Sequence, residues 1–162
     1  CTPQSPNCLF CPLSGSCRAL SEGKVQQLPV KQHRTKTTNR YFNYIYVRMG
    51  AHTLIHKRTE DDIWKNLFEL PLVETEKDLS EEEFLACPQF HALFAEGEVR
   101  MVRTLLRGVK HVLSHRVIYT NFYEVTLPDN SSFFSSYQRV AVEDLGRYAV
   151  PRLIHAFLEK YV

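Results

Sequence analysis

The stretch from Val99 to Leu127, VRMVRTLLRGVKHVLSHRVIYTNFYEVTL, indicates the fold class of this 162-residue chain. Val, Leu, Tyr and Phe recur along it, and these residues favour extended backbone over helix or loop. Ser114 and His115 interrupt the apolar run near its middle. The pattern therefore predicts two long extended segments, 99–113 and 117–127, with a short polar connection between them.

Further strands are expected on both sides of this stretch. Residues 41–48 contain β-branched and aromatic residues in alternation, which predicts a strand. Met49 and Gly50 then turn the chain into a second apolar run, 53–57. The two runs are predicted to form a β-hairpin. Residues 133–140 are expected to form another strand.

Two helical regions complete the pattern. In residues 80–95, Ser80 can cap a helix and Glu83 follows three positions later, as in a capping box. Pro88 should split or kink this region, because proline removes a helical hydrogen bond. Residues 151–161 are predicted to form an amphipathic closing helix. Mixed strands with a mid-chain and a terminal helix predict an α/β (α+β) sandwich.

The first seventeen residues contain four cysteines, at intervals of six, two and five residues. Cys8 and Cys11 have the CxxC spacing that bends a chain around a metal centre. The uneven intervals to Cys1 and Cys17 favour a [4Fe-4S] cluster over a zinc ion. Zinc, disulfides and cysteines without a ligand remain the alternatives. Cys87 stands alone and is expected to be a small buried side chain.

Composition is typical of a packed globular protein, with 44% hydrophobic and 12% aromatic residues. No apolar stretch has the length that a bilayer-spanning helix requires. Closely spaced thiols indicate a reducing compartment.

Charge is unevenly distributed, although the net charge is only +2. Residues 21–40 have five basic residues against one acidic residue, and residues 98–127 have five against two. Residues 61–97 instead have ten acidic residues against two basic ones. The asymmetry suggests one face for a polyanion, but charge alone slightly favours ordinary solvated faces.

Four segments together resemble a known family. IWKNLFELP at 63–71 resembles its W-x-x-L-x-E-x-P signature, and HVLSH at 111–115 resembles its H-x-F-S-H loop. YAVP at 148–151 and LPVK at 28–31 resemble its C-terminal end and its linker. With the cysteine loop, they are similar to the MutY-type A/G-specific adenine DNA glycosylases.

The resemblance implies three parts. Residues 1–20 would be the iron–sulfur cluster loop that ends a catalytic domain, with Cys1, Cys8, Cys11 and Cys17 as ligands. Residues 21–40 would be a basic linker, and residues 41–162 a Nudix or MutT-like mixed-sheet domain that recognises 8-oxoguanine. In this family the catalytic acid and base belong to the preceding domain. The chain by itself is therefore expected to be inactive.

The resemblance also implies a DNA site. Ser114 is expected to read the lesion, and Leu113 stands where the family usually has Phe as a wedge. Duplex DNA with 8-oxoguanine:adenine mispairs is the implied partner of a monomer in the bacterial cytoplasm, at the nucleoid. The residues assigned to lesion or DNA contact are Arg18, Lys110, His111, Leu113, Ser114, His115 and Arg116.

An active Nudix pyrophosphohydrolase is the first alternative. That chemistry needs an R-E-U-x-E-E helix whose carboxylates hold Mg²⁺. The candidate carboxylates at 69, 74, 76 and 81–83 include no Arg-Glu dipeptide, and no glycine lies between Gly50 and Gly97. A protein-interaction module with residues 21–40 as its docking segment is the second alternative.

Overall fold

The computed structural model describes residues 6–28, 37–94, 99–131 and 136–162. The chain divides into two compact units, Cys1–Lys36 and Thr37–Val162. Among the described residues, no helix is long and apolar enough to cross a membrane.

Short helical turns make up the first unit. Two 3₁₀ turns, Cys8–Phe10 and Ser14–Ser16, are followed by helix α1, Arg18–Ser21. Cys11 ends the first turn, and Cys17 lies between the second turn and α1. None of these three elements contains a buried residue. In its described residues the first unit therefore has no apolar core of its own.

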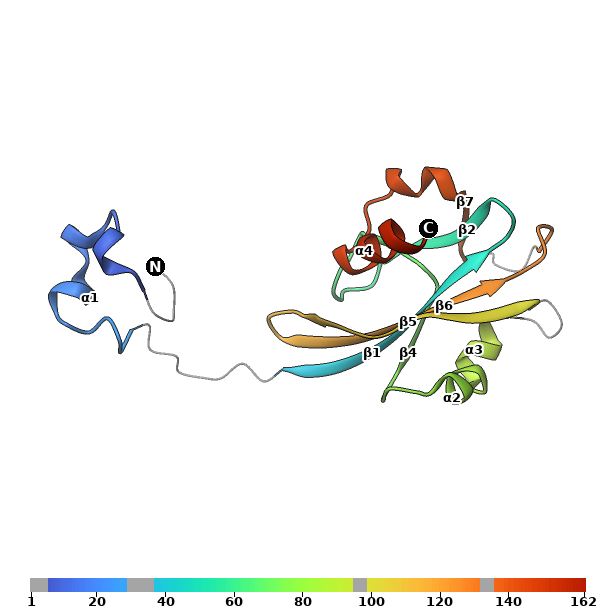
Figure 1. Ribbon diagram of the computed structural model, residues 1–162, viewed down its shortest axis with the longest axis horizontal. Coiled ribbons are helices and arrows are strands. Elements are labelled where there is room, and N and C mark those ends of the chain that lie inside the picture. Colours follow the sequence, from blue (N-terminus) through green and yellow to red (C-terminus); the bar gives the residue numbers. More distant parts are fainter. Residues whose placement is uncertain (1–5, 29–36, 95–98, 132–135) are drawn as a thin grey trace. The chain divides into compact units, whose positions relative to one another are not determined.

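A four-stranded sheet is the centre of the second unit (Figure 1). Its strands lie in the order β4-β1-β6-β5, namely Leu72–Thr75, Thr38–Arg48, Arg116–Thr126 and Met101–Val112. β1 and β6 run parallel over eleven residue pairs, and β5 and β6 run antiparallel. The two long extended segments predicted from the sequence are confirmed.

A second sheet has the order β3-β2-β7, with strands Phe68–Glu69, His52–Lys57 and Gln138–Ala141. The predicted hairpin of β1 with β2 is present only at its turn, where Met49 and His52 form an antiparallel bridge. Beyond this bridge the two strands belong to different sheets, because β1 pairs with β4 and β6. The turn passes through Gly50, which has φ +55°. The strand expected at 133–140 begins at Gln138, and residues 132–135 lie outside the described residues.

The helices agree closely with the sequence pattern. α2, Glu81–Leu85, begins with the predicted capping box of Ser80 and Glu83. Pro88 separates it from α3, Pro88–Leu93. A 3₁₀ segment, Val142–Arg147, precedes the closing helix α4, Arg152–Tyr161.

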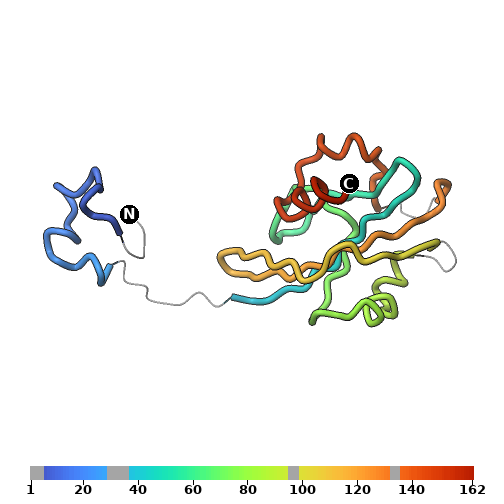
Figure 2. Tube along the Cα trace, viewed as in Figure 1, coloured from blue at the N-terminus to red at the C-terminus, as the bar shows by residue number. Residues whose placement is uncertain are grey.

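The two faces of the four-stranded sheet carry separate cores, because alternate strand residues point to opposite sides. α4 covers one face, where the rings of Phe122 and Phe157 stack at 4.1 Å. α2 and α3 cover the other face, as the tube of Figure 2 shows. There the rings of Phe84 and Tyr123 stack at 4.2 Å. Cys87 is buried in this second core, which confirms its predicted role.

Candidate nucleic-acid interface

The β5–β6 hairpin ends in the predicted polar connection, residues 113–115. The backbone N–H of Leu113 donates to the carbonyl of Arg116 at 2.8 Å and closes the tip. The N–H of Thr38 on β1 donates to the carbonyl of His115 at 3.1 Å. Ser114 and His115 are exposed at this tip. The tip therefore presents two polar side chains on backbone that is hydrogen-bonded at both ends.

Strand alternation sorts the side chains beside the tip. His111 is half-buried with its ring 5.9 Å from that of Trp64, and Leu113 is half-buried against the α4-side core. Lys110 is exposed, and Val112 is 65% exposed. Sequence reasoning assigned the apolar contact to Leu113 and missed Val112. Strand alternation could have indicated this, because Val112 lies two residues after Lys110 and therefore on the same face of the strand.

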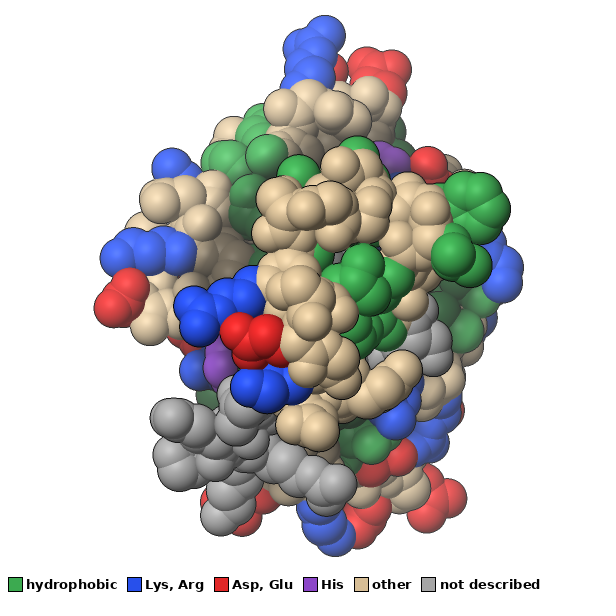
Figure 3. Space-filling model, turned by 90° about the vertical axis from the view of Figure 1, so that its left-hand side faces the viewer, with side chains coloured by type: hydrophobic (Ala, Val, Ile, Leu, Met, Phe, Trp, Pro, Cys, Tyr) green, Lys and Arg blue, Asp and Glu red, His purple; other side chains and the backbone are tan. Residues whose placement is uncertain are grey.

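Most basic residues near the hairpin already have an acidic or carbonyl partner. Arg103 lies 3.2 Å from Glu124, and Arg107 donates to the carbonyl of Leu79 at 2.6 Å. Arg116 is ion-paired with Asp62. Figure 3 looks onto the first unit, where blue basic side chains likewise lie beside red acidic ones. The charge blocks of the sequence thus meet as ion pairs in the fold.

Lys110 differs from these arginines. Its ammonium group lies 6.0 Å from the ring centroid of Tyr119, and within the described parts of the chain it has no carboxylate partner. Its charge is therefore available at the surface of the hairpin.

The remaining predicted site residues lie in the first unit. Arg18 is 90% exposed in its side chain and pairs with Glu22 at 2.6 Å. Cys8, Cys11 and Cys17 are free and half-buried, and Cys1 lies outside the described residues. In the part of the chain that the structure describes, no three His, Cys, Asp or Glu side chains form a metal-binding group. The thiols still match a four-cysteine cluster in residue type.

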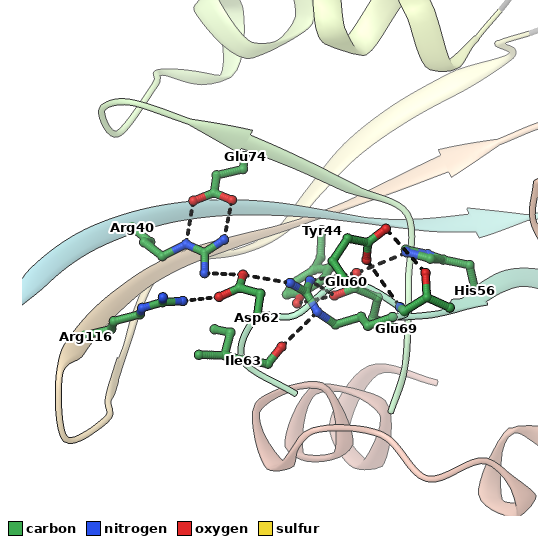
Figure 4. A network of polar contacts seen from close by, with 11 residues as sticks. Arg40, Tyr44, His56, Glu60, Asp62, Ile63, Glu69, Glu74 and Arg116 are labelled. Carbon is green, nitrogen blue, oxygen red and sulfur yellow. Dashed lines mark hydrogen bonds and ion pairs between the residues drawn. The ribbon is translucent and has the colours of Figure 1, made fainter. Parts of the chain in front are cut away.

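Asp62 is the centre of a polar network beneath the hairpin (Figure 4). Its Oδ2 accepts from Arg40 Nη1 at 2.6 Å and from Arg58 Nη2 at 3.1 Å. Its Oδ1 accepts from Arg116 Nη1. Partial burial opposes ionisation of Asp62, but hydrogen bonds from Arg116 and Arg40 outweigh it and hold the pKa of the carboxyl well below its ordinary value.

Glu69 is the buried end of the same network. Its carboxylate accepts from Arg58 Nη1 at 2.8 and 2.9 Å and from the Tyr44 hydroxyl at 2.9 Å. His56 Nε2 lies 3.2 Å from it. Burial and the neighbouring carboxylate raise the pKa of Tyr44 well above its ordinary value, so that hydroxyl remains a donor. Glu69 is the acid of the W-x-x-L-x-E-x-P segment.

The loop between β2 and β3 forms a closed turn that holds both acids. The Arg58 N–H donates to the Leu67 carbonyl at 2.9 Å, and the Asn66 N–H donates to the Arg58 carbonyl at 2.8 Å. Trp64 and Asn66 have positive φ of 60° and 68°. The Trp64 ring lies between those of Phe42 and His111, with centroid distances of 6.1 and 5.9 Å. Trp64 thus packs against the core and also braces the hairpin through His111.

The acidic start of α2 has local structural roles. Glu83 accepts from the N–H of Ser80 at 2.8 Å and from Lys77 Nζ at 3.0 Å. Glu81 accepts from the hydroxyl of Thr104. These contacts give Glu81 and Glu83 structural roles at the start of α2.

Comparison with known proteins places this geometry in a family. A family model for the NUDIX domain matches residues 43–160. The adenine DNA glycosylase of Buchnera aphidicola subsp. Acyrthosiphon pisum (strain APS) is 25% identical over 164 residues, covering 99% of this chain and 44% of that protein. The adenine DNA glycosylase of Buchnera aphidicola subsp. Schizaphis graminum (strain Sg) is 33% identical over 75 residues, covering 46% and 22%. The chain thus spans less than half the length of these relatives.

Solved structures agree in fold. The C-terminal domain of mouse MUTYH, in its complex with human PCNA, matches with a TM-score of 0.60 and 15% identity, covering 75% of this chain and 86% of that one. A NUDIX domain of Shewanella oneidensis NrtR, complexed with ADP ribose, matches with a TM-score of 0.51 and 12% identity, covering 85% and 94%. This chain belongs to the NUDIX domain family and is homologous to the C-terminal NUDIX-type part of adenine DNA glycosylases.

Proposed function

We propose that this chain is the lesion-recognition part of an adenine DNA glycosylase and reads 8-oxoguanine opposite the adenine that is removed. The observation that supports this most is the exposed Ser114 at the tip of a hairpin that is tied to β1 and braced by Trp64. A reader of base edges needs such a small polar group on rigid backbone.

Ser114 can recognise the oxidised edge of the base. Guanine N7 only accepts a hydrogen bond, whereas N7 of 8-oxoguanine carries a hydrogen and C8 carries an oxygen. A serine hydroxyl can accept from N7–H or donate to O8. One base-edge contact contributes roughly 1–3 kcal/mol of discrimination. His115, also exposed at the tip, is a second contact candidate, and the half-buried His111 orders the loop.

General affinity would come from contacts that are independent of the base. Lys110 is a phosphate contact on the same strand as the tip, with Arg18 as a further candidate. Val112 and Leu113 supply apolar side chains beside the lesion, and side chains of this type can wedge between base steps. We expect the whole protein to act on double-stranded DNA in the cytoplasm, as a monomer.

Adenine removal would belong to the part of the whole protein that precedes this chain. In this chain, Cys1, Cys8, Cys11 and Cys17 would hold a [4Fe-4S] cluster at the end of that catalytic domain, and they match its four-thiolate ligand set. The purified whole protein should then be brown and contain about four irons per chain. Stoichiometric zinc without iron would contradict this assignment.

The test of base reading is Ser114→Ala in the whole protein, assayed for adenine excision opposite 8-oxoguanine and opposite guanine. The preference for the 8-oxoguanine mispair should fall by about tenfold, since 1.4 kcal/mol corresponds to that factor. Ser136→Ala, which changes an exposed serine outside the hairpin, is the control. Equal slowing on both mispairs, or no change on either, would show that Ser114 does not read the base.

Pyrophosphohydrolase activity is the competing function. Two of the three α2 carboxylates, Glu81 and Glu83, already have local partners, and the metal-binding helix pattern is absent from the sequence. We therefore expect no Mg²⁺-dependent hydrolysis of nucleoside triphosphates, the oxidised guanine nucleotide included. Turnover that disappears in Glu81→Ala or Glu82→Ala would favour the hydrolase instead.

A further inference from the structure

We propose that Asp62 is a positioning residue for the lesion-reading hairpin and that it keeps Arg116 out of general phosphate binding. The inference rests on the proposed DNA-reading function. It changes the expectation for Arg116, which sequence reasoning grouped with Lys110 as a phosphate contact.

Asp62 joins three separate parts of the fold through one carboxylate. Arg40 comes from β1, Arg58 from the closed loop, and Arg116 from the first residue of β6. Both carboxylate oxygens are used, as Figure 4 shows for Arg40 and Arg116 on either side of Asp62. A neutral amide at this position would hold the three guanidinium groups less strongly, because it offers one acceptor oxygen instead of two and no ion-pair attraction.

Arg116 is fixed at both its backbone and its side chain. Its carbonyl accepts the N–H of Leu113, which closes the tip one residue before Ser114. It also pairs with Thr38 in the β1–β6 ladder. The ion pair with Asp62 thus holds the side chain of Arg116, while backbone hydrogen bonds hold its main chain next to Ser114.

The network is electrically balanced and becomes more exposed toward the hairpin. Exposed fractions of the side chains rise from 2% at Glu69 through 8% at Arg58 and 21% at Asp62 to 36% at Arg116. Glu74 completes the balance by accepting from Arg40 Nε and Nη2, both at 2.6 Å. Three arginines thus face three carboxylates, and the Asp62 contact engages Arg116 Nη1 and neutralises the charge that a DNA phosphate would attract.

Lys110 provides the internal contrast, since it lies on the same hairpin without a carboxylate partner among the described residues. If the ion pair with Asp62 keeps Arg116 from binding phosphate, Lys110 and Arg116 should contribute differently to the salt dependence of binding to undamaged DNA. Each phosphate contact contributes about 0.9 to the slope of log affinity against log salt.

The experiment measures the dissociation constants of the full 162-residue chain for duplexes with guanine or 8-oxoguanine opposite adenine, over a series of salt concentrations. Asp62→Asn should release Arg116, tighten binding to the undamaged duplex and steepen its salt slope by about 0.9. The preference for 8-oxoguanine should fall. A variant that was only loosened structurally would bind undamaged DNA more weakly instead.

Asp61→Asn is the matched control. It removes the same charge from the same loop, but its side chain is 99% exposed and pairs only with Lys65, at 3.2 Å, among the described residues. It should leave the preference for 8-oxoguanine unchanged. An identical effect of Asp61→Asn and Asp62→Asn would overturn the inference.

Arg116→Met keeps the test decisive if Asp62→Asn does not fold. It should lower the preference for 8-oxoguanine while leaving the salt slope on undamaged DNA unchanged, whereas Lys110→Met should flatten that slope by about 0.9. Equal flattening by both variants would overturn the role given to Asp62. Equal binding of the unaltered chain to both duplexes would instead contradict the proposed function. Even then, the salt slopes of the variants on undamaged DNA would decide whether Asp62 keeps Arg116 from binding phosphate.

Discussion

The two faces of the central sheet are built by different chemistry. On the α2–α3 face, Phe84 has no exposed surface, and its ring stacks on Tyr123 and contacts Phe90 at 5.2 Å. On the opposite face, near the hairpin, the buried contacts include the ion pair of Arg58 with Glu69. One face is held by apolar burial, and part of the other by directed charge pairs.

The two kinds of contact contribute differently to the stability of the fold and to the positions of individual side chains. Apolar burial is non-directional and stabilises in proportion to area, so it fixes the fold without fixing any one side chain. A buried charge pair gains little net stability, because desolvation offsets its attraction. Its geometry is specific, however, and on this face it orients the residues that support Ser114. We therefore expect changes on the two faces to have different consequences for stability and for base reading.

Phe84→Ala should have the largest effect. Truncating a fully buried phenylalanine costs about 3–5 kcal/mol, so the free energy of unfolding should fall by that amount in urea titrations. The molecules that remain folded should keep their preference for 8-oxoguanine. A loss of preference with intact folding would mean that the α2–α3 face also positions the hairpin.

Arg58→Met should follow, with a cost of about 3 kcal/mol, because it removes the guanidinium partner of the buried Glu69 carboxylate, which Tyr44 and His56 do not replace. Unlike Phe84→Ala, it should also reduce the preference for 8-oxoguanine. Arg147→Met is the control, since that arginine is 81% exposed and its pair with Asp144 should contribute less than 1 kcal/mol. If Arg58→Met changes only stability, the two faces do not differ as proposed.

Acid should weaken the polar face before it affects the apolar one. The folded-state pKa of Asp62 lies below its unfolded value of about 3.9, so its contribution to stability is present above that pH and is lost as the pH falls toward the folded-state pKa. Urea midpoints measured between pH 5 and 2 should fall less steeply for Asp62→Asn than for the unaltered chain. Parallel curves would show that Asp62 is not held ionised in the fold.

Val112→Ala should have the smallest effect on stability, within about 0.5 kcal/mol, because its side chain is largely exposed. If Val112 contacts DNA, binding should nevertheless weaken. Leu113→Ala should reverse the pattern, since Leu113 packs against the core. Thermal melts and DNA-binding titrations compare the two variants directly. If only Leu113→Ala weakens binding, the apolar contact with DNA belongs to Leu113 and not to Val112.

Local patterns predicted much of this fold. Alternation located the two long strands, and the capping box of Ser80 with Glu83 located the start of α2. The pairing of β1 was mispredicted, because a turn at Met49-Gly50 does not reveal that strands distant in sequence already occupy both edges. Secondary-structure signals are local, whereas sheet partners are chosen by the whole fold.

The candidate site shows the same division. The position of Ser114 at the hairpin tip follows from the apolar runs on either side of it. The ion pair of Asp62 with Arg116 joins residues 54 positions apart, and no periodicity in either segment predicts it. The exposure of Val112 could have been inferred from strand alternation, but the motif resemblance directed attention to Leu113.

The parallel pairing of β1 with β6 has a consequence for how the chain is made. Each β1 residue pairs with one 78 positions later, whereas its β4 partners lie about 30 positions away. At about 5–20 residues per second, a ribosome needs roughly 4–16 s to cover that longer interval. During this time one edge of the sequence YFNYIYV has no native neighbour, and an apolar strand edge readily pairs with other chains. Yield during synthesis should therefore depend on how long nascent β1 is shielded, more than on the final stability of the domain.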